Sequence, residues 1–257
     1  MSGAALVGVG LLGLVWGSFV GLLVSRGATD EPIASGRSRC DACGATLAPR
    51  DLVPIASWLV LRGRCRRCGA GIPVRWPAIE LATCALFVLA ALVTPDPRAW
   101  LLVAPFLGVL LALTAIDLEH RRLPNRIVYP TAALAGAWIV GTRFVDGPLD
   151  PSRAAVGALA FGGSLLVVSL ASRGGMGLGD VKLAGLIGLV VGAIDLASVA
   201  VAAGAAVLLG GLVAVVALLR GAGRRTAIPF GPMLAAGALV ALVAGRDIAD
   251  AYLRLLR

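Results

Sequence analysis

The sequence predicts an all-α, polytopic membrane protein with about eight transmembrane helices and one small soluble insertion. Of its 257 residues, 59% are hydrophobic and only 14% are charged, whereas soluble domains carry about 25% charged residues. One core cannot bury this much apolar surface in a chain of this length. The hydrophobic residues also gather into separate runs of membrane-spanning length, with the charged residues between them.

Each predicted span is an apolar run near the ~20 residues that cross a bilayer. The runs lie at 4–25, 76–94, 99–116, 127–142, 153–172, 181–194, 196–219 and 228–245. Glycine and alanine occur throughout them, which suits close helix packing in lipid. The short run at 181–194 is expected to be tilted, partly re-entrant or merged with its neighbour. The first run lacks the basic stretch and cleavage site of a removable signal peptide, so we expect it to be retained.

The arginines predict the orientation of the spans. They concentrate between residues 26 and 75 and recur in the loops 117–126, 173–180 and 220–227. The positive-inside rule therefore places these segments in the cytoplasm and the N-terminus outside. Because the positive clusters follow the loops, the net charge of +9 does not indicate nucleic-acid binding.

Three regions follow from this pattern. Residues 1–25 form the first transmembrane helix, residues 26–75 form a soluble cytoplasmic insertion, and residues 76–257 form a transmembrane domain. The insertion is too short to be held together by its own apolar core, which predicts that another element stabilises it.

The insertion contains two C-x-x-C pairs, each followed directly by a glycine. The four cysteines are Cys40, Cys43, Cys65 and Cys68. Two such pairs supply four thiolates, the ligand set of a closed, structural zinc site. The alternatives are two disulfides or unconnected thiols, and a cytoplasmic location disfavours persistent disulfides. We therefore expect these cysteines to hold a Zn²⁺ ion that folds the insertion.

Two aspartates lie at the ends of predicted spans, where a charge is costly in a membrane and usually functional. Asp117 follows the run ending at Ile116, and Asp180 follows a stretch containing Gly177 and Gly179. Two carboxylates brought together can share a proton, so that one is the acid and the other the base in attack of water on a peptide bond. Glycines without a Cβ would let an extended substrate approach closely. The alternatives are a helix N-cap for Asp180 and a solvated helix end for Asp117.

These residues resemble the motifs of the type IV prepilin peptidase family. The stretch 177–183, GLGDVKL, is similar to the GxGD signature of that family, and 117–125, DLEHRRLPN, is similar to its other aspartate segment. Residues 51–65, 72–81 and 228–232 match further motifs in the same order. The resemblance thus extends from the first span almost to the end of the chain.

The resemblance implies a multi-pass GxGD aspartyl protease of the bacterial inner membrane, with its active site facing the cytoplasm. It implies that Asp117 and Asp180 are the catalytic pair, and that the substrates are type IV prepilins or pseudopilins with a short basic leader. Such enzymes serve type IV pili or type II secretion. Family members with the cysteine module often also N-methylate the new N-terminus, using S-adenosylmethionine.

Two further residues are candidates for supporting roles. Glu80 is a candidate for the methyl-transfer activity, with an ion pair to Arg75 or Arg62 as the alternative. Lys182 is expected either to contact substrate or to extend its amine to the membrane surface. A different function is a transporter that uses the two aspartates as a cation or proton relay. Repeat symmetry between the two halves of the sequence would favour that function. The sequence shows no such symmetry.

Overall fold

The computed structural model describes residues 2–27, 29, 32, 37–172, 176–221, 223 and 228–255, which form helices and connecting loops without a β-sheet. Two compact units divide the chain: Met1–Thr94 with Ala104–Ala112, and Pro95–Val103 with Leu113–Arg257. Arg173, Arg224 and Arg225, three of the arginines on which the predicted orientation of the spans depends, lie outside the described residues.

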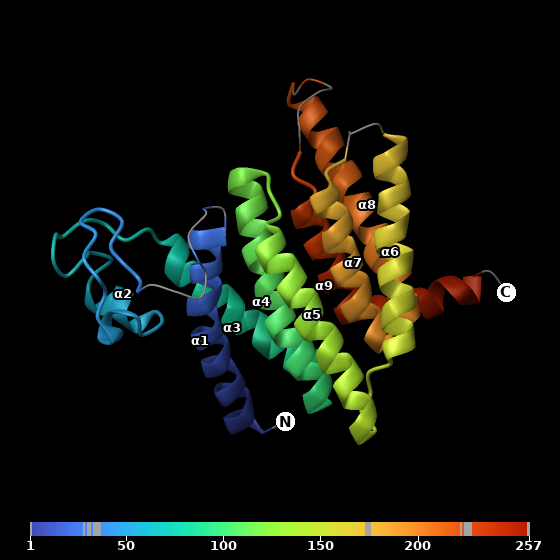
Figure 1. Cartoon of the computed structure of the whole chain (residues 1–257), viewed down its shortest axis with the longest axis horizontal. Helices are drawn as coiled ribbons and strands as arrows, with labels where there is room; N and C mark the ends of the chain where they lie inside the picture. Colours follow the sequence, from blue (N-terminus) through green and yellow to red (C-terminus); the bar gives the residue numbers. More distant parts are fainter. Residues whose placement is uncertain are drawn as a thin grey trace. The chain divides into compact units, whose positions relative to one another are not determined.

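All eight predicted apolar runs are helices (Figure 1). They are α1 (Gly3–Gly27), α3 (Arg75–Val93), α4 (Pro97–His120), α5 (Asn125–Thr142), α6 (Pro151–Ala171), α7 (Leu178–Ile194), α8 (Leu196–Leu219) and α9 (Gly231–Leu255). Among the described residues, six of them are long and apolar enough to cross a membrane: α1, α3, α4, α6, α8 and α9. The all-α membrane fold is therefore confirmed, while a total of about eight spans stays a prediction.

Three aspartates outside the insertion lie at helix starts. The side chain of Asp96 accepts hydrogen bonds from the first amides of α4, that of Asp150 from those of α6, and that of Asp195 from Ser198 in α8. Each carboxylate satisfies amides that lack a partner within their own helix. Asp117 lies in the last turn of α4 and Asp180 is the third residue of α7, so neither precedes the helix that carries it, unlike these three residues.

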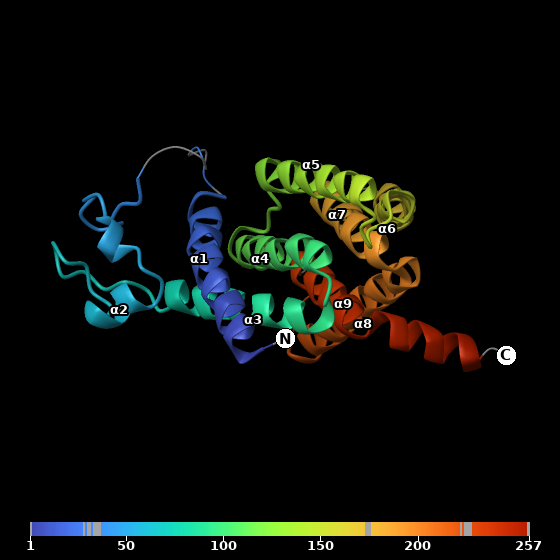
Figure 2. The same ribbon diagram turned by 90° about the horizontal axis from the view of Figure 1, so that it is seen from below.

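In the first unit, glycines bring α1 and α3 together where the two helices cross (Figure 2). A Cβ added at Gly13 would lie 2.7 Å from the Cα of Cys84, and one added at Gly17 would lie 2.7 Å from the Cα of Glu80. Small residues allow this backbone approach, as is common between membrane helices. The contact fixes Glu80 against α1, near the soluble insertion.

The insertion carries little regular structure apart from a short helix, α2 (Ala56–Val60), and a 3₁₀ turn, η1 (Pro49–Asp51). Its two cysteine pairs repeat the same turn. Cys40 N donates to Ala45 O and Gly44 N to Cys40 O; Cys65 N donates to Ala70 O and Gly69 N to Cys65 O. Both glycines have positive φ angles, +66° and +70°, which glycine adopts without the strain of a side chain.

In the second unit, α6 and α7 pack backbone to backbone along a row of glycines. A Cβ added at Gly188 would collide with the carbonyl oxygen of Gly157, and one added at Gly162 would lie 3.0 Å from the Cα of Gly185. α8 and α9 are similarly close, because a Cβ at Gly245 would lie 2.7 Å from the Cβ of Ser198. The position of α7, which carries Asp180, therefore depends on these small residues.

We expect Gly188→Ala to destabilise the second unit by about 1–3 kcal/mol, because the new methyl group overlaps a backbone atom that cannot rotate away. Thermal unfolding of the purified protein in detergent measures the loss. Gly163→Ala is the matched control, since a Cβ at Gly163 on α6 meets no atom within 4 Å. Equal melting temperatures for the two variants would contradict this account of the packing.

Candidate active site and metal centre

Asp117 lies within the last turn of α4, which extends to His120. Its side chain is buried, with 5% of the residue exposed, so the alternative of a solvated helix-end acid is wrong. One carboxylate oxygen, Oδ2, accepts a hydrogen bond of 2.9 Å from the backbone amide of Gly231. Gly231 is the first residue of α9. The N-terminus of another helix thus holds this carboxylate.

This arrangement compensates for an unfavourable position. A carboxylate near the C-terminal end of its own helix faces the negative end of the helix dipole. The N-terminal end of α9 presents partial positive charge and an amide that has no partner within its helix. Gly231 therefore offsets, at Asp117, the repulsion that α4 itself produces.

Asp180 is the third residue of α7 and is half-buried. Gly177 is the N-cap of that helix, so the alternative of an N-cap role for Asp180 is wrong. Asp117 is the one charged group in the described part of the chain whose charge acts on the Asp180 carboxyl. Among the residues that the structure describes, no hydrogen bond to the Asp180 carboxylate is present. Its oxygens are available to water or substrate there.

The two predicted glycines have different surroundings. A Cβ added at Gly179 would lie 3.2 Å from the Cβ of Leu123, in the connection between α4 and α5. A Cβ at Gly177 would have room, because the nearest atom is the Asp180 Oδ2 at 3.7 Å. Gly179 therefore lets α7 approach the segment that follows Asp117, whereas Gly177 keeps space open beside Asp180.

Lys182 links α7 to the beginning of α5. Its Nζ donates a hydrogen bond of 3.0 Å to the Asn125 side chain and lies 5.4 Å from the centre of the Tyr129 ring. Lys182 thus has partners in the protein, and a role in binding substrate stays a prediction. Together with the contacts of Asp117 and Gly179, this bond brings the end of α4 and the starts of α5, α7 and α9 to one end of the second unit.

Glu80 has a backbone partner that the sequence did not suggest. Its Oε2 accepts a hydrogen bond of 2.7 Å from the amide of Ile55, just before α2. Ile55 has a φ angle of +61°, which is rare and costly for a β-branched residue. The guanidinium of Arg75 lies over the Trp76 ring, 4.4 Å from its centre. Glu80 therefore fixes the strained turn that leads into α2.

The four cysteines of the insertion form one cluster. Their sulfur atoms all lie within 4.8 Å of one another, and Cys40 and Cys68 are 3.9 Å apart. A tetrahedral zinc site with Zn–S bonds of ~2.3 Å would separate its sulfurs by ~3.8 Å, so the donor set fits Zn²⁺. All five cysteines are free thiols, so the disulfide alternative is not what the structure contains.

Backbone amides already favour a thiolate in this cluster. Hydrogen bonds from the amides of Cys68 and Arg67 lower the pKa of the Cys65 thiol to about 6. A thiol with that pKa is largely ionised at neutral pH, and the thiolate is the form that binds metal. The cluster can therefore hold a metal ion.

We expect Cys65→Ser to abolish zinc binding and to unfold the insertion, because the free energy of metal binding, about 10–16 kcal/mol in small zinc modules, is also their folding free energy. Elemental analysis of the purified protein reads the zinc content, and limited proteolysis reads the order of residues 37–75. Cys84→Ser is the control, since Cys84 lies in α3, outside the cluster. Retained zinc in Cys65→Ser would contradict the site.

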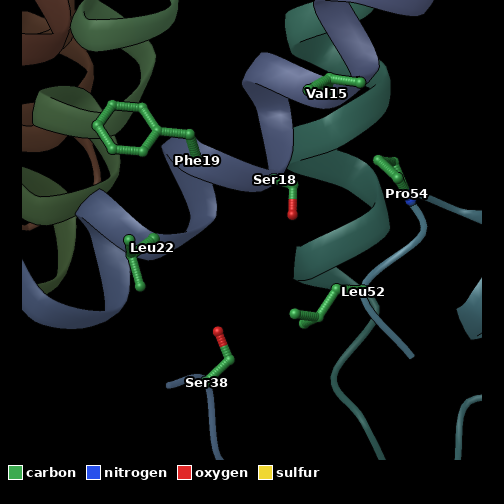
Figure 3. A pocket seen from close by; sticks show the side chains of 7 residues that line it. All are labelled: Val15, Ser18, Phe19, Leu22, Ser38, Leu52 and Pro54. Carbon is green, nitrogen blue, oxygen red and sulfur yellow. The ribbon is translucent and has the colours of Figure 1, made fainter. Parts of the chain in front are cut away.

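A shallow hollow of about 300 Å³ lies between α1 and the insertion (Figure 3). Its lining is Val15, Ser18, Phe19, Leu22, Ser38, Leu52 and Pro54. Ser18 and Ser38 extend hydroxyls into it from opposite sides (Figure 3). Among the described residues that line this hollow, none is acidic, so these residues supply no carboxylate to a cationic cofactor such as S-adenosylmethionine.

Sequence reasoning missed one site residue, Gly231. A sequence signal for it exists, because residues 228–232 match a family motif. That motif does not indicate which residue Gly231 contacts. The amide of Gly231 and the carboxylate of Asp117 are 114 residues apart in the chain.

Comparison with known proteins shows which family the chain resembles. The Bacterial Peptidase A24 N-terminal domain matches residues 11–94, and the Type IV leader peptidase family matches residues 104–219. A "Prepilin leader peptidase/N-methyltransferase" from Bacillus subtilis is 34% identical over 95% of this chain and 96% of that relative. A "Type 4 prepilin-like proteins leader peptide-processing enzyme" from Escherichia coli O78:H11 is 35% identical over 82% of this chain and 76% of its own length. No solved structure matches.

Proposed function

The chain belongs to the type IV leader peptidase family, and we propose on that premise that Asp117 and Asp180 form a catalytic dyad that removes the basic leader of type IV prepilins or pseudopilins. The observation that carries the proposal is the meeting of four helix ends in the second unit. That meeting buries Asp117, half-buries Asp180 and brings both aspartates to the same end of the unit. Their chemistry is that of an aspartic endopeptidase.

In this mechanism one carboxylate removes a proton from water as the water oxygen attacks the peptide carbonyl. The other, protonated, carboxyl group then gives its proton to the amide nitrogen as the C–N bond breaks. Gly231 keeps the Asp117 carboxylate in one orientation, which limits the loss of rate from misalignment. The substrate must be extended at the cut, because the amides of a helix are already hydrogen bonded and shielded.

The proposed location is the bacterial inner membrane, with the dyad facing the cytoplasm. Three arginines follow Asp117 closely, at positions 121, 122 and 126, and basic loops stay on the cytoplasmic side. A leader that has not been translocated is also on that side. The bound Zn²⁺ is proposed as structural, because four thiolates complete its coordination and leave no position for a reacting water.

N-methylation of the new N-terminus from S-adenosylmethionine is a proposed second activity, and the names of the relatives are its support. We derive no methyl-transfer step, because the described residues of the hollow beside α1 include no acidic group to hold the cofactor. Glu80 is proposed to hold the turn before α2 through the Ile55 amide rather than to react itself.

The test is cleavage of a tagged pilin precursor by the purified protein in proteoliposomes without an ion gradient. Mass spectrometry reads both the cut site and any added methyl mass after S-adenosylmethionine is supplied. A single cut at the end of the basic leader is expected. An intact precursor would refute the peptidase, and ion flux in a second set of proteoliposomes, prepared with an ion gradient, would then favour the transporter. A cut without added mass would limit the enzyme to proteolysis.

A further inference from the structure

The end of α2 is apolar and exposed, although it lies in the insertion and outside every apolar span. Leu59 is 61% exposed and Val60 is 77% exposed. The helix cannot turn these side chains inward, because Trp58 donates its indole N–H to Ile72 O at 3.1 Å. Gly63 N also donates to Trp58 O at 2.8 Å. The residues on either side of the second cysteine pair, Gly63 and Ile72, therefore hold Leu59 and Val60, which we call the α2 tip, in an outward position.

Exposed arginines surround the α2 tip. Arg62 and Arg64 follow it closely in the chain. The amide of Arg62 donates to Leu59 O, and the amide of Arg64 donates to Leu61 O, each at 3.0 Å. The positive φ angles of Arg62 and Gly63, +52° and +65°, turn the chain back, so both arginines stay at the end of α2.

The whole insertion is strongly basic. Residues 37–75 contain eight arginines and two aspartates, and Asp51 is already paired with Arg66 at 2.9 Å. Four thiolates around a Zn²⁺ ion would add two negative charges and leave the segment positive. The charges that face a partner at the α2 tip are therefore those of arginine.

The insertion is held against two candidate membrane spans, α1 and α3. The amide of Ile55 binds Glu80, which lies ~7.5 Å along α3 from its first residue at 1.5 Å per residue. Leu52 and Pro54 face Val15 and Ser18 of α1 across the hollow (Figure 3). Trp76, at the start of α3, is the kind of residue that marks a membrane interface. The start of α2 is thus held beside the first turns of α3.

We propose that the α2 tip and its arginines bind the anionic headgroup surface of the same membrane and hold the insertion on the bilayer. Leu59 and Val60 enter the apolar edge of the headgroup layer, and Arg62 and Arg64 pair with lipid phosphates. An apolar wedge flanked by arginines is the chemistry of interfacial membrane binding. A basic leader peptide is disfavoured as the occupant, because these arginines would repel it.

The test is hydrogen exchange of the full-length protein in lipid nanodiscs, read by mass spectrometry over residues 56–64. In one set of nanodiscs the lipid is phosphatidylcholine alone. In the other set, about 30% of the lipid is replaced by phosphatidylglycerol. We expect exchange to be ~10-fold slower with the anionic lipid and to recover in 1 M salt, since headgroup attraction is electrostatic. Leu59→Asn combined with Val60→Asn should remove the protection.

The matched control is Leu253→Asn combined with Leu255→Asn, two exposed apolar residues at the end of α9, which should leave the protection unchanged. Unchanged zinc content shows that the tip variant keeps its fold. Equal exchange in both lipids would overturn the proposal. So would protection that appears only when a pilin precursor is added, which would make the α2 tip a protein-binding surface.

Discussion

Asp117→Asn and Asp180→Asn are each expected to lower the rate of leader cleavage by roughly 10²–10⁴-fold, the range contributed by general acid–base groups. Asparagine keeps the shape of the side chain, and at position 117 it can still accept the amide hydrogen bond of Gly231. It cannot take or give a proton at the reacting bond. Initial rates on a tagged precursor, at equal amounts of inserted protein, measure the loss.

Asp195→Asn is the matched control in the same unit. The Asp195 carboxylate caps α8 through Ser198, and asparagine is as good an N-cap as aspartate. Its cleavage rate should therefore stay at the wild-type level. A wild-type rate in Asp117→Asn or Asp180→Asn would remove that residue from the catalytic pair, whatever the effect of the other.

Hydropathy predicted the presence of the helices better than their ends. The run predicted at 99–116 extends as α4 to His120, and the one predicted at 228–245 begins at Gly231 and extends as α9 to Leu255. An apolar run marks only the part of a helix that lipid or core surrounds. Capping groups and charges determine how far the helix extends beyond that run. The first turn of α7, for example, contains Asp180, because an acid is favourable near a helix N-terminus.

In the metal cluster and the candidate active site, the residues that have a local sequence signature were predictable from the sequence. The C-x-x-C pairs gave the metal cluster because each turn is formed by neighbouring residues. The two aspartates stood out because charges are rare at the ends of apolar runs. The partners of Asp117 and Glu80 are backbone amides, of Gly231 and Ile55. An amide has no residue-specific signal, so the sequence suggested arginines for Glu80 and nothing for Asp117.

Gly231→Ala should lower the turnover number by about 10²-fold, the scale expected when a reacting group moves by about 1 Å. A Cβ at Gly231 would lie 2.7 Å from the Asp117 Oδ2 and 3.2 Å from its Cγ. The carboxylate would have to leave its place and lose the amide of α9. Steady-state kinetics measure kcat and KM separately. We expect kcat to fall and KM to stay near the wild-type value, because the methyl group faces Asp117.

Gly211→Ala on α8 is the control for Gly231→Ala, because a Cβ at Gly211 meets no atom within 4 Å. A role in positioning predicts that both variants melt at similar temperatures while only Gly231→Ala loses activity. A drop in melting temperature that accompanies the lost activity would instead make Gly231 a packing residue of α9. An unchanged kcat would mean that α4 tolerates the Asp117 charge at its C-terminal end without help from α9, contrary to the expected effect of the helix dipole.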